Sequence, residues 1–201
     1  MMVTVPKLLR FFYPSLEWSV KNNSNSVYLT FDDGPHPQIT EQVLDILDQY
    51  NAQATFFCVG DNVRKYPKIY QQIITRGHKT GIHTFHHLNG WRSANTKYLQ
   101  DVEEAAKLID SNLFRPPYGK ISPYQIFRLK KKYRIIMWTV LTYDFSKAIS
   151  PQVCLQNSLL GLKAGYIVVF HDSEKSKKNM QFALPRFLEQ SQKMGFNLKS
   201  L

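Results

Sequence analysis

Two adjacent carboxylates near the start of the chain are the first residues whose types and spacing point to chemistry. Val27, Leu29 and Phe31 alternate as the buried face of a strand does, and Asp32 and Asp33 follow directly. Two neighbouring anions repel each other, so the fold must supply a compensating cation, let one carboxylate take up a proton, or do both. The alternative is a solvated Asp-Asp-Gly-Pro turn, because these residue types form turns readily.

A cluster of histidines supplies the partners that a metal site requires. His83 and His87 are spaced i,i+4, which places two imidazoles on one side of a helical turn. With one carboxylate of Asp32 or Asp33 they make a two-His, one-carboxylate site that leaves positions open for water and substrate. His86 is i+3 from His83 and competes for the same role, and a His-rich surface loop is the alternative to a metal site.

Three further polar residues follow apolar or rigid segments. His171 comes directly after the apolar run 166–170, and an imidazole with an ordinary pKa of about 6.5 suits proton transfer near neutral pH. Arg115 stands beside two prolines, and its guanidinium can hold a carboxylate through two hydrogen bonds. Asp144 lies just beyond another β-like run.

The elements that must position these residues alternate between strands and helices. Strand-like runs lie at 27–31, 54–59, 134–142 and 166–170, and helical patterns lie at 39–50, 66–74, 98–109, 121–132, 151–162 and 182–194. This alternation predicts an α/β fold with a parallel sheet or barrel. The polar residues follow the ends of apolar runs, and those ends share one face of a β/α barrel. Asp101 is expected on the exposed face of its helix.

Composition indicates one globular domain with a basic surface. The 201 residues are 43% hydrophobic, which is enough for a sizeable core. The net charge of +11 favours an acidic partner such as an anionic glycan, a nucleic acid or a membrane surface. The lysine clusters at 130–132 and 175–178 are not interleaved with a nucleic-acid motif, so we expect a solvated basic surface and no nucleic-acid partner.

The sequence gives little information about targeting, cysteine chemistry or assembly. No apolar run is long enough to span a bilayer. Arg10 and Pro14 interrupt the apolar N-terminal stretch, so we expect no signal peptide, a cytoplasmic location, and an extension at 1–25 that packs on the domain. Cys58 and Cys154 are expected as buried free thiols. The sequence carries no signature of a particular oligomeric state.

Five segments of the chain, in order, resemble the motifs of the polysaccharide deacetylases, the NodB-homology domain of carbohydrate esterase family 4. They are residues 30–35, 83–87, 115–119, 138–145 and 168–171. The resemblance covers residues 26–201 and implies that these form one catalytic domain. It implies a distorted, TIM-barrel-like (β/α) barrel with about seven parallel strands, and metal-dependent removal of N-acetyl groups from an amino sugar or polysaccharide of chitin or peptidoglycan type, with release of acetate. An O-acetyl esterase on the same scaffold and a non-catalytic glycan-binding domain are the alternatives.

The resemblance also implies roles for the residues around the metal. Asp33, His83 and His87 correspond to the metal ligands, which favours His87 over His86. Asp32 corresponds to the catalytic base, tethered by an arginine that corresponds to Arg115. Two histidines and one carboxylate suit zinc and tolerate other divalent ions such as Co²⁺.

The remaining implied roles concern the acid and the oxyanion. His171 corresponds to the catalytic acid, Asp144 to its partner, and the backbone N–H of Tyr118 to an oxyanion donor. The fourth motif departs from the family pattern at two positions. Leu141 stands where the family has an aspartate, and Phe145 stands where it has a tryptophan. Neither departure removes an ionisable group that the mechanism requires.

Overall fold

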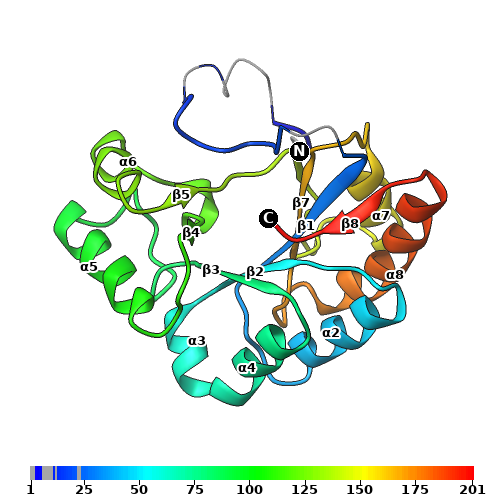
Figure 1. Ribbon diagram of the computed structural model, residues 1–201, viewed down its shortest axis with the longest axis horizontal. Coiled ribbons are helices and arrows are strands. Elements are labelled where there is room, and N and C mark those ends of the chain that lie inside the picture. The colour runs from blue at the N-terminus through cyan, green and yellow to red at the C-terminus, as the bar shows by residue number, and fades with distance from the viewer. Residues whose placement is uncertain (1–2, 6–10, 12, 22–23) are drawn as a thin grey trace.

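The computed structural model describes residues 3–5, 11, 13–21 and 24–201, and its centre is a sheet of parallel strands surrounded by helices (Figure 1). The strands among these residues are β1 (Ser26–Asp32), β2 (Thr55–Cys58), β3 (Lys79–Ile82), β4 (Leu113–Phe114), β5 (Arg134–Ile135), β6 (Val140–Leu141), β7 (Ile167–His171) and β8 (Asn197–Lys199). The helices are α2 (Ile39–Gln49), α3 (Gly60–Lys65), α4 (Pro67–Thr75), α5 (Asn95–Ala106), the short η1 (Pro117–Gly119), α6 (Pro123–Leu129), α7 (Pro151–Leu159) and α8 (Lys177–Lys193).

The strands lie side by side in the order β5-β4-β3-β2-β1-β7-β6, and β8 pairs with the start of β1. Every pairing between two of these strands is parallel, as expected when helices connect consecutive strands. The central strand β1 is therefore paired on both sides. Its register with β7 places Asp32 directly opposite His171.

One segment joins the two edges of the sheet. The sequence predicts a single strand over 134–142, but this segment is two short strands at opposite edges of the sheet. Its first part pairs with β4, where the Ile136 N–H donates to Phe114 at 2.8 Å. Its second part pairs with β7, where the Thr139 N–H donates to Ile167 at 2.9 Å. The sheet therefore curls into the distorted barrel that the sequence predicts.

Alternate residues of β1 face two different cores. Val27, Leu29 and Phe31 pack in the layer between the sheet and the helices, whereas Tyr28 packs inside the curl with Phe57. The other members of the inner core are Leu113, Ile136, Ile167 and Leu201. The chain ends at the centre of the ring of strands (Figure 1). Filling the curl with apolar side chains leaves only its open end for polar chemistry.

The helices bury one face each against the outer side of the sheet. In α2 the buried residues include Ile39, Val43 and Leu47, which recur at helical spacing. Ser122 caps α6 with a reciprocal capping box, and Ser150 caps α7. These signals lie in the sequence, which is why the predicted helices match the observed ones to within a few residues at most ends.

The described N-terminal residues lie along the segment that joins the sheet edges. The Leu141 N–H donates to Val3 at 2.9 Å, and Glu17 exchanges hydrogen bonds with Ile135 and Met137 at 2.8 and 2.7 Å. Most of the apolar stretch that bears on a signal peptide, residues 8–10 and 12, lies outside the described residues.

Candidate active site

The first carboxylate of the pair lies inside the curl. Strand alternation places Tyr28, Thr30 and Asp32 on one face of β1, and Asp32 is the last residue of the strand. Its side chain is 6% exposed, so an uncompensated charge there would be costly. The strand thus carries a carboxylate to the mouth of the barrel.

Arg115 provides the compensating cation. It follows β4 and is fully buried. One guanidinium nitrogen donates to the Asp32 carboxylate at 2.7 Å and to the Thr30 hydroxyl at 2.8 Å, and the other donates to the Met137 carbonyl at 2.9 Å. The guanidinium also lies 4.1 Å from the centre of the Phe57 ring. Burial lowers the pKa of Arg115, and the charge of Asp32 opposes that shift. The pair holds one carboxylate oxygen in a fixed position.

The second carboxylate turns the opposite way. Asp33 has φ 83°, an uncommon conformation for a residue other than glycine, and this bend takes its side chain out of the strand's alternation. Its Oδ1 lies 3.1 Å from His87 Nε2 and 3.7 Å from His83 Nε2. Burial raises the pKa of Asp33, but the hydrogen bond from His87 and the positive charge of His171 outweigh burial and bring it below its ordinary value. Asp33 is therefore ionised.

These three side chains fit a metal ion. The ligand atoms of Asp33, His83 and His87 all lie within 4.8 Å of one another. His83 Nδ1 donates to the Arg115 carbonyl at 2.8 Å, which leaves Nε2 with a free lone pair. Burial lowers the pKa of His83 to about 4, so this imidazole is neutral, as a ligand must be. One anionic oxygen and neutral imidazole nitrogens match the donors that zinc and similar ions prefer.

The histidine segment is a loop rather than the predicted helical turn. Thr84 and His87 have φ 59° and 56°, so the backbone bends twice and brings the two imidazoles together, with ring centres 5.0 Å apart. Asp101 anchors this loop. Its carboxylate accepts the backbone N–H groups of Phe85 and His86 at 2.7 and 2.9 Å, and it binds His86 Nδ1 at 2.5 Å. His86 is thereby directed away from Asp33.

The expectation that Asp101 is exposed is wrong, since it is 5% exposed. It lies three residues after buried Tyr98 and four before buried Ala105, so helical spacing places it on the buried face of α5. An aspartate on that face was a signal of a polar partner that the sequence reasoning overlooked.

His171 and Asp144 form a second buried pair at the barrel mouth. Asp144 Oδ1 lies 2.7 Å from His171 Nδ1, and Asp144 Oδ2 accepts the His171 backbone N–H at 2.7 Å. Burial lowers the pKa of His171, but the charge and hydrogen bond of Asp144 and the charges of Asp33 and Asp32 outweigh it and raise the pKa to about 10. The imidazole is therefore protonated near neutral pH, as a general acid must be.

Asp172 is a buried carboxylate that the sequence reasoning did not single out. It accepts hydrogen bonds from the Gly34 N–H at 3.0 Å and the Thr40 hydroxyl at 2.6 Å. Burial raises its pKa to about 8. These bonds tie the turn after Asp33 to the end of β7. The position of Asp172, directly after the histidine at the end of an apolar strand, was the sequence signal that could have identified it.

Tyr118 borders the site with both its backbone and its side chain. It lies in the η1 turn with φ 60°, and its side chain is 60% exposed. The hydroxyl lies 3.1 Å from His87 Nδ1, so the residue contacts the ring of a candidate metal ligand. Tyr118 thus lies at the same opening of the barrel as the Asp32–Arg115 and Asp144–His171 pairs.

The predicted residues converge on one cavity of about 260 Å³, which we call the catalytic cavity. It is lined by Asp32, Asp33, His83, His87, Tyr118, Trp138, Leu141, Phe145, Val169, His171 and Lys175. Leu141 and Phe145, the two residues that depart from the family pattern, both lie in the wall of this cavity. Leu141 makes part of the wall apolar, and the Phe145 ring meets His171 edge-on at 4.9 Å between centres. Arg115 and Asp144 stand behind the wall and hold the residues that line it.

A buried ion pair, a triad that fits a metal ion and a carboxylate–imidazole pair at the open end of a curled parallel sheet define a hydrolase of the distorted-barrel class. The model of one family, polysaccharide deacetylase, matches residues 19–133, more than half of the 201-residue chain. The chain belongs to the polysaccharide deacetylase family. This membership confirms the resemblance drawn from the five motifs and the predicted class of enzyme, a deacetylase that hydrolyses linear amides.

Individual relatives extend the match over most of the chain. A peptidoglycan-N-acetylglucosamine deacetylase of Bacillus cereus is 34% identical over 188 residues, which cover 89% of this chain and 87% of that protein. A chitooligosaccharide deacetylase of Azorhizobium caulinodans is 35% identical over 76% of each chain. The crystal structure of the Bc1960 peptidoglycan N-acetylglucosamine deacetylase superposes with a TM-score of 0.89 at 28% identity and covers 98% of this chain and 95% of that one.

Among the described residues, no helix has the length and apolar character needed to cross a membrane. The two cysteines are buried and free, as predicted.

Proposed function

We propose that the protein removes the acetyl group from N-acetylglucosamine residues of a peptidoglycan-like or chitin-like glycan, with zinc as the bound metal. The relatives that are named for these substrates support the sugar class. The single observation that carries the chemistry is the placement of the Asp32–Arg115 pair, the Asp33, His83 and His87 triad, and His171 around one cavity.

The metal site divides the two adjacent aspartates between two duties. Asp33, His83 and His87 would hold a divalent ion, and when bound it would supply positive charge to a developing oxyanion and lower the pKa of a water molecule. Asp32 accepts the proton of the attacking water. Because Arg115 engages Asp32 Oδ1, we assign Oδ2 as the oxygen that takes this proton.

His171 protonates the departing amine. Its Nδ1 is engaged by Asp144, so the proton is delivered from Nε2. Asp144 keeps the imidazole protonated and fixes its orientation, as a buried carboxylate does for a catalytic histidine. The balance is simple: water adds to the acetamide carbonyl, the carbon–nitrogen bond breaks, and acetate and a free amine leave.

The backbone N–H of Tyr118 is assigned to the oxyanion that forms at the acetamide carbonyl. The place of Tyr118 in the wall of the catalytic cavity supports this assignment. One such donor is worth about 2.7–4 kcal/mol of transition-state stabilisation in comparable sites.

Acetate release across a substrate panel tests the proposal. The panel contains chitohexaose, peptide-free peptidoglycan strands, acetylated xylan and monomeric N-acetylglucosamine, each with added Zn²⁺ or with a chelator. We expect release from the first two substrates only when metal is present. Release from acetylated xylan alone would show that the protein is an O-acetyl esterase instead. Release that continues in the presence of the chelator would contradict a metal-dependent reaction. The cytoplasmic location stays a prediction.

A further inference from the structure

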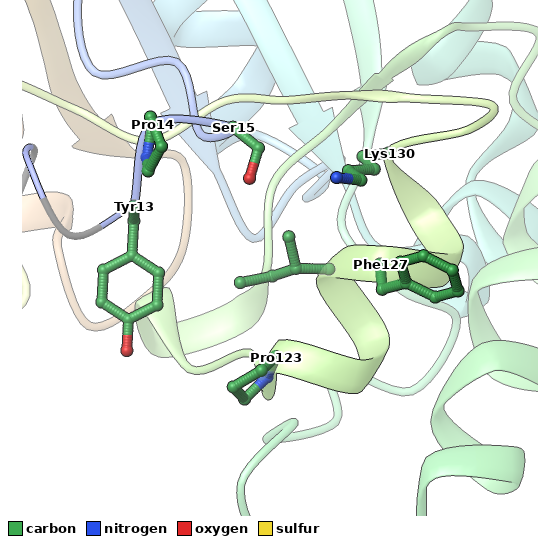
Figure 2. A pocket seen from close by; sticks show the side chains of 7 residues that line it. Tyr13, Pro14, Ser15, Pro123, Phe127 and Lys130 are labelled. Carbon is green, nitrogen blue, oxygen red and sulfur yellow. The ribbon is translucent and has the colours of Figure 1, made fainter.

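The catalytic cavity is the first of three adjoining hollows. A second one of about 330 Å³, the middle cavity, shares Tyr118, Trp138 and Leu141 with the catalytic cavity. A third one of about 590 Å³, the outer cavity, shares Tyr13 with the middle cavity. The outer cavity lies between residues 13–15 and α6, with Tyr13 and Pro123 at one end and Lys130 opposite Ser15 (Figure 2). We call these three neighbouring cavities, with the reacting atoms at one end, the path.

The walls of this path suit sugar rings. Trp91, Tyr118, Trp138 and Tyr143 line the middle cavity, and Tyr13 continues the aromatic surface into the outer one. Aromatic faces of this kind, joined to a few polar groups, are typical of sites for small organic ligands.

Trp91 is held rigidly although it is exposed. Its side chain is 63% exposed, and its indole N–H donates to the Ile121 carbonyl at 3.0 Å. Lys120 lies with its ammonium 3.8 Å from the centre of the ring. An exposed tryptophan that is fixed by a hydrogen bond and a cation loses little conformational entropy when a ligand stacks on it.

The charged side chains that line the middle and outer cavities are all positive. Lys120 lines the middle cavity and Lys130 the outer one, and no carboxylate is present among the described residues that line either. Neither lysine forms an ion pair with a carboxylate of the described chain. The catalytic cavity carries Lys175 beside its two aspartates. The complementary ligand is therefore a chain of sugar rings that bears carboxylates beyond the reacting sugar.

We propose that the three cavities form a groove for an extended acidic glycan. The reacting N-acetyl sugar occupies the catalytic cavity, the next rings lie on the aromatic walls of the middle cavity, and carboxylates of the chain face Lys120 and Lys130. The inference rests on the proposed function and specifies its substrate as an anionic polymer. Tyr13, Trp91, Lys120 and Lys130 all lie outside the five motifs that carry the catalytic residues.

Binding to a non-hydrolysing variant tests the groove separately from the reaction. Asp32→Asn protein is titrated calorimetrically with a peptide-free peptidoglycan hexasaccharide, which carries carboxylates, and with chitohexaose, which is neutral and of equal length. We expect the acidic hexasaccharide to bind more tightly, and Lys120→Ala and Lys130→Ala each to weaken it about two- to fivefold, as exposed ion pairs allow. Affinity for chitohexaose should stay the same in Lys130→Ala, which leaves the contacts that hold Trp91 in place. Added salt should reduce the difference between the two ligands.

Two controls keep the test sharp. Lys131→Ala removes a neighbouring cation that lies against Phe127 and lines neither cavity, so it should leave both affinities unchanged. Tyr13→Ala should weaken the hexasaccharide but not the disaccharide of the same acidic glycan. Equal affinity for the acidic and the neutral hexasaccharide would overturn the proposal, as would equal effects of Lys130→Ala and Lys131→Ala. Because binding is measured without turnover, absence of deacetylation would count against the proposed function alone.

Discussion

Replacing Asp144 by asparagine should convert a broad pH profile into one that collapses above neutral pH. In the structure Asp144 is the largest of the influences that raise the pKa of His171 to about 10. Asparagine keeps the size of the side chain but removes the negative charge. Burial then dominates, and we expect the pKa of His171 to fall to its ordinary value of 6.5 or below.

The size of the effect follows from the protonated fraction of His171. At pH 8 a group with a pKa of about 10 is almost fully protonated, whereas one with a pKa of 6.5 is only about 3% protonated. Loss of the acid alone should therefore lower kcat about thirtyfold at pH 8, and by less than about twofold at pH 6.

The same substitution should also destabilise the fold. The two carboxylate oxygens accept N–H groups from the His171 ring, the His171 backbone and the Phe145 backbone. An amide has one oxygen, so at least one buried N–H would face the NH₂ group, which costs about 1–3 kcal/mol.

The raised pKa of His171 also makes the stability of the wild-type protein depend on pH. Because folding raises the pKa of His171, its contribution is fully present below the unfolded pKa of 6.5 and is lost as the pH rises through about 10. The variant should lack this decline.

The assay is acetate release at saturating substrate and metal from pH 5.5 to 9.5, with urea unfolding of both proteins at each pH. Parallel kcat profiles for Asp144→Asn and wild type would refute the reasoning, because they would show that Asp144 does not set the acidity of His171. A uniform loss at all pH values would assign Asp144 to orientation alone.

Three further substitutions test the supporting contacts. Arg115→Met removes the cation that faces buried Asp32 and should cost about 3–5 kcal/mol in urea unfolding, since it leaves one charge unpaired; unchanged stability would contradict the ion pair. Tyr118→Phe removes the hydroxyl at His87 Nδ1 and should weaken zinc affinity in a chelator competition by roughly tenfold or more, with most of kcat retained at saturating metal; equal zinc affinity would contradict this contact. Gly34→Ala would place a methyl group on a buried carboxylate and should lower the thermal midpoint by several degrees, whereas an unchanged midpoint would show that the turn yields.

The sequence could bring the candidate catalytic residues together because their spacing follows the elements. Asp32 and His171 end apolar runs, and parallel strands bring such ends to one edge. The helices could be predicted because their apolar spacing and caps are local signals.

The features that sequence reasoning missed depend on pairing rather than on local pattern. The segment 134–142 reads as one strand, yet it serves both edges of the sheet, and only closure of the barrel reveals that. The i,i+4 spacing of His83 and His87 predicts a helical turn, but positive φ angles at two residues make it a loop. Asp101 holds that loop through backbone N–H groups, so the sequence could indicate that Asp101 has a polar partner but not which groups it binds.

The most direct test of the account measures zinc binding and acetate release together in Asp32→Asn and Asp33→Asn. The two residues are neighbours, but one faces Arg115 and the other faces the histidines. We expect Asp32→Asn to bind zinc with an affinity close to that of the wild type and to release no acetate, and Asp33→Asn to lose zinc as well as activity. Full activity in Asp32→Asn, or zinc lost equally from both variants, would contradict the separate duties of the two carboxylates.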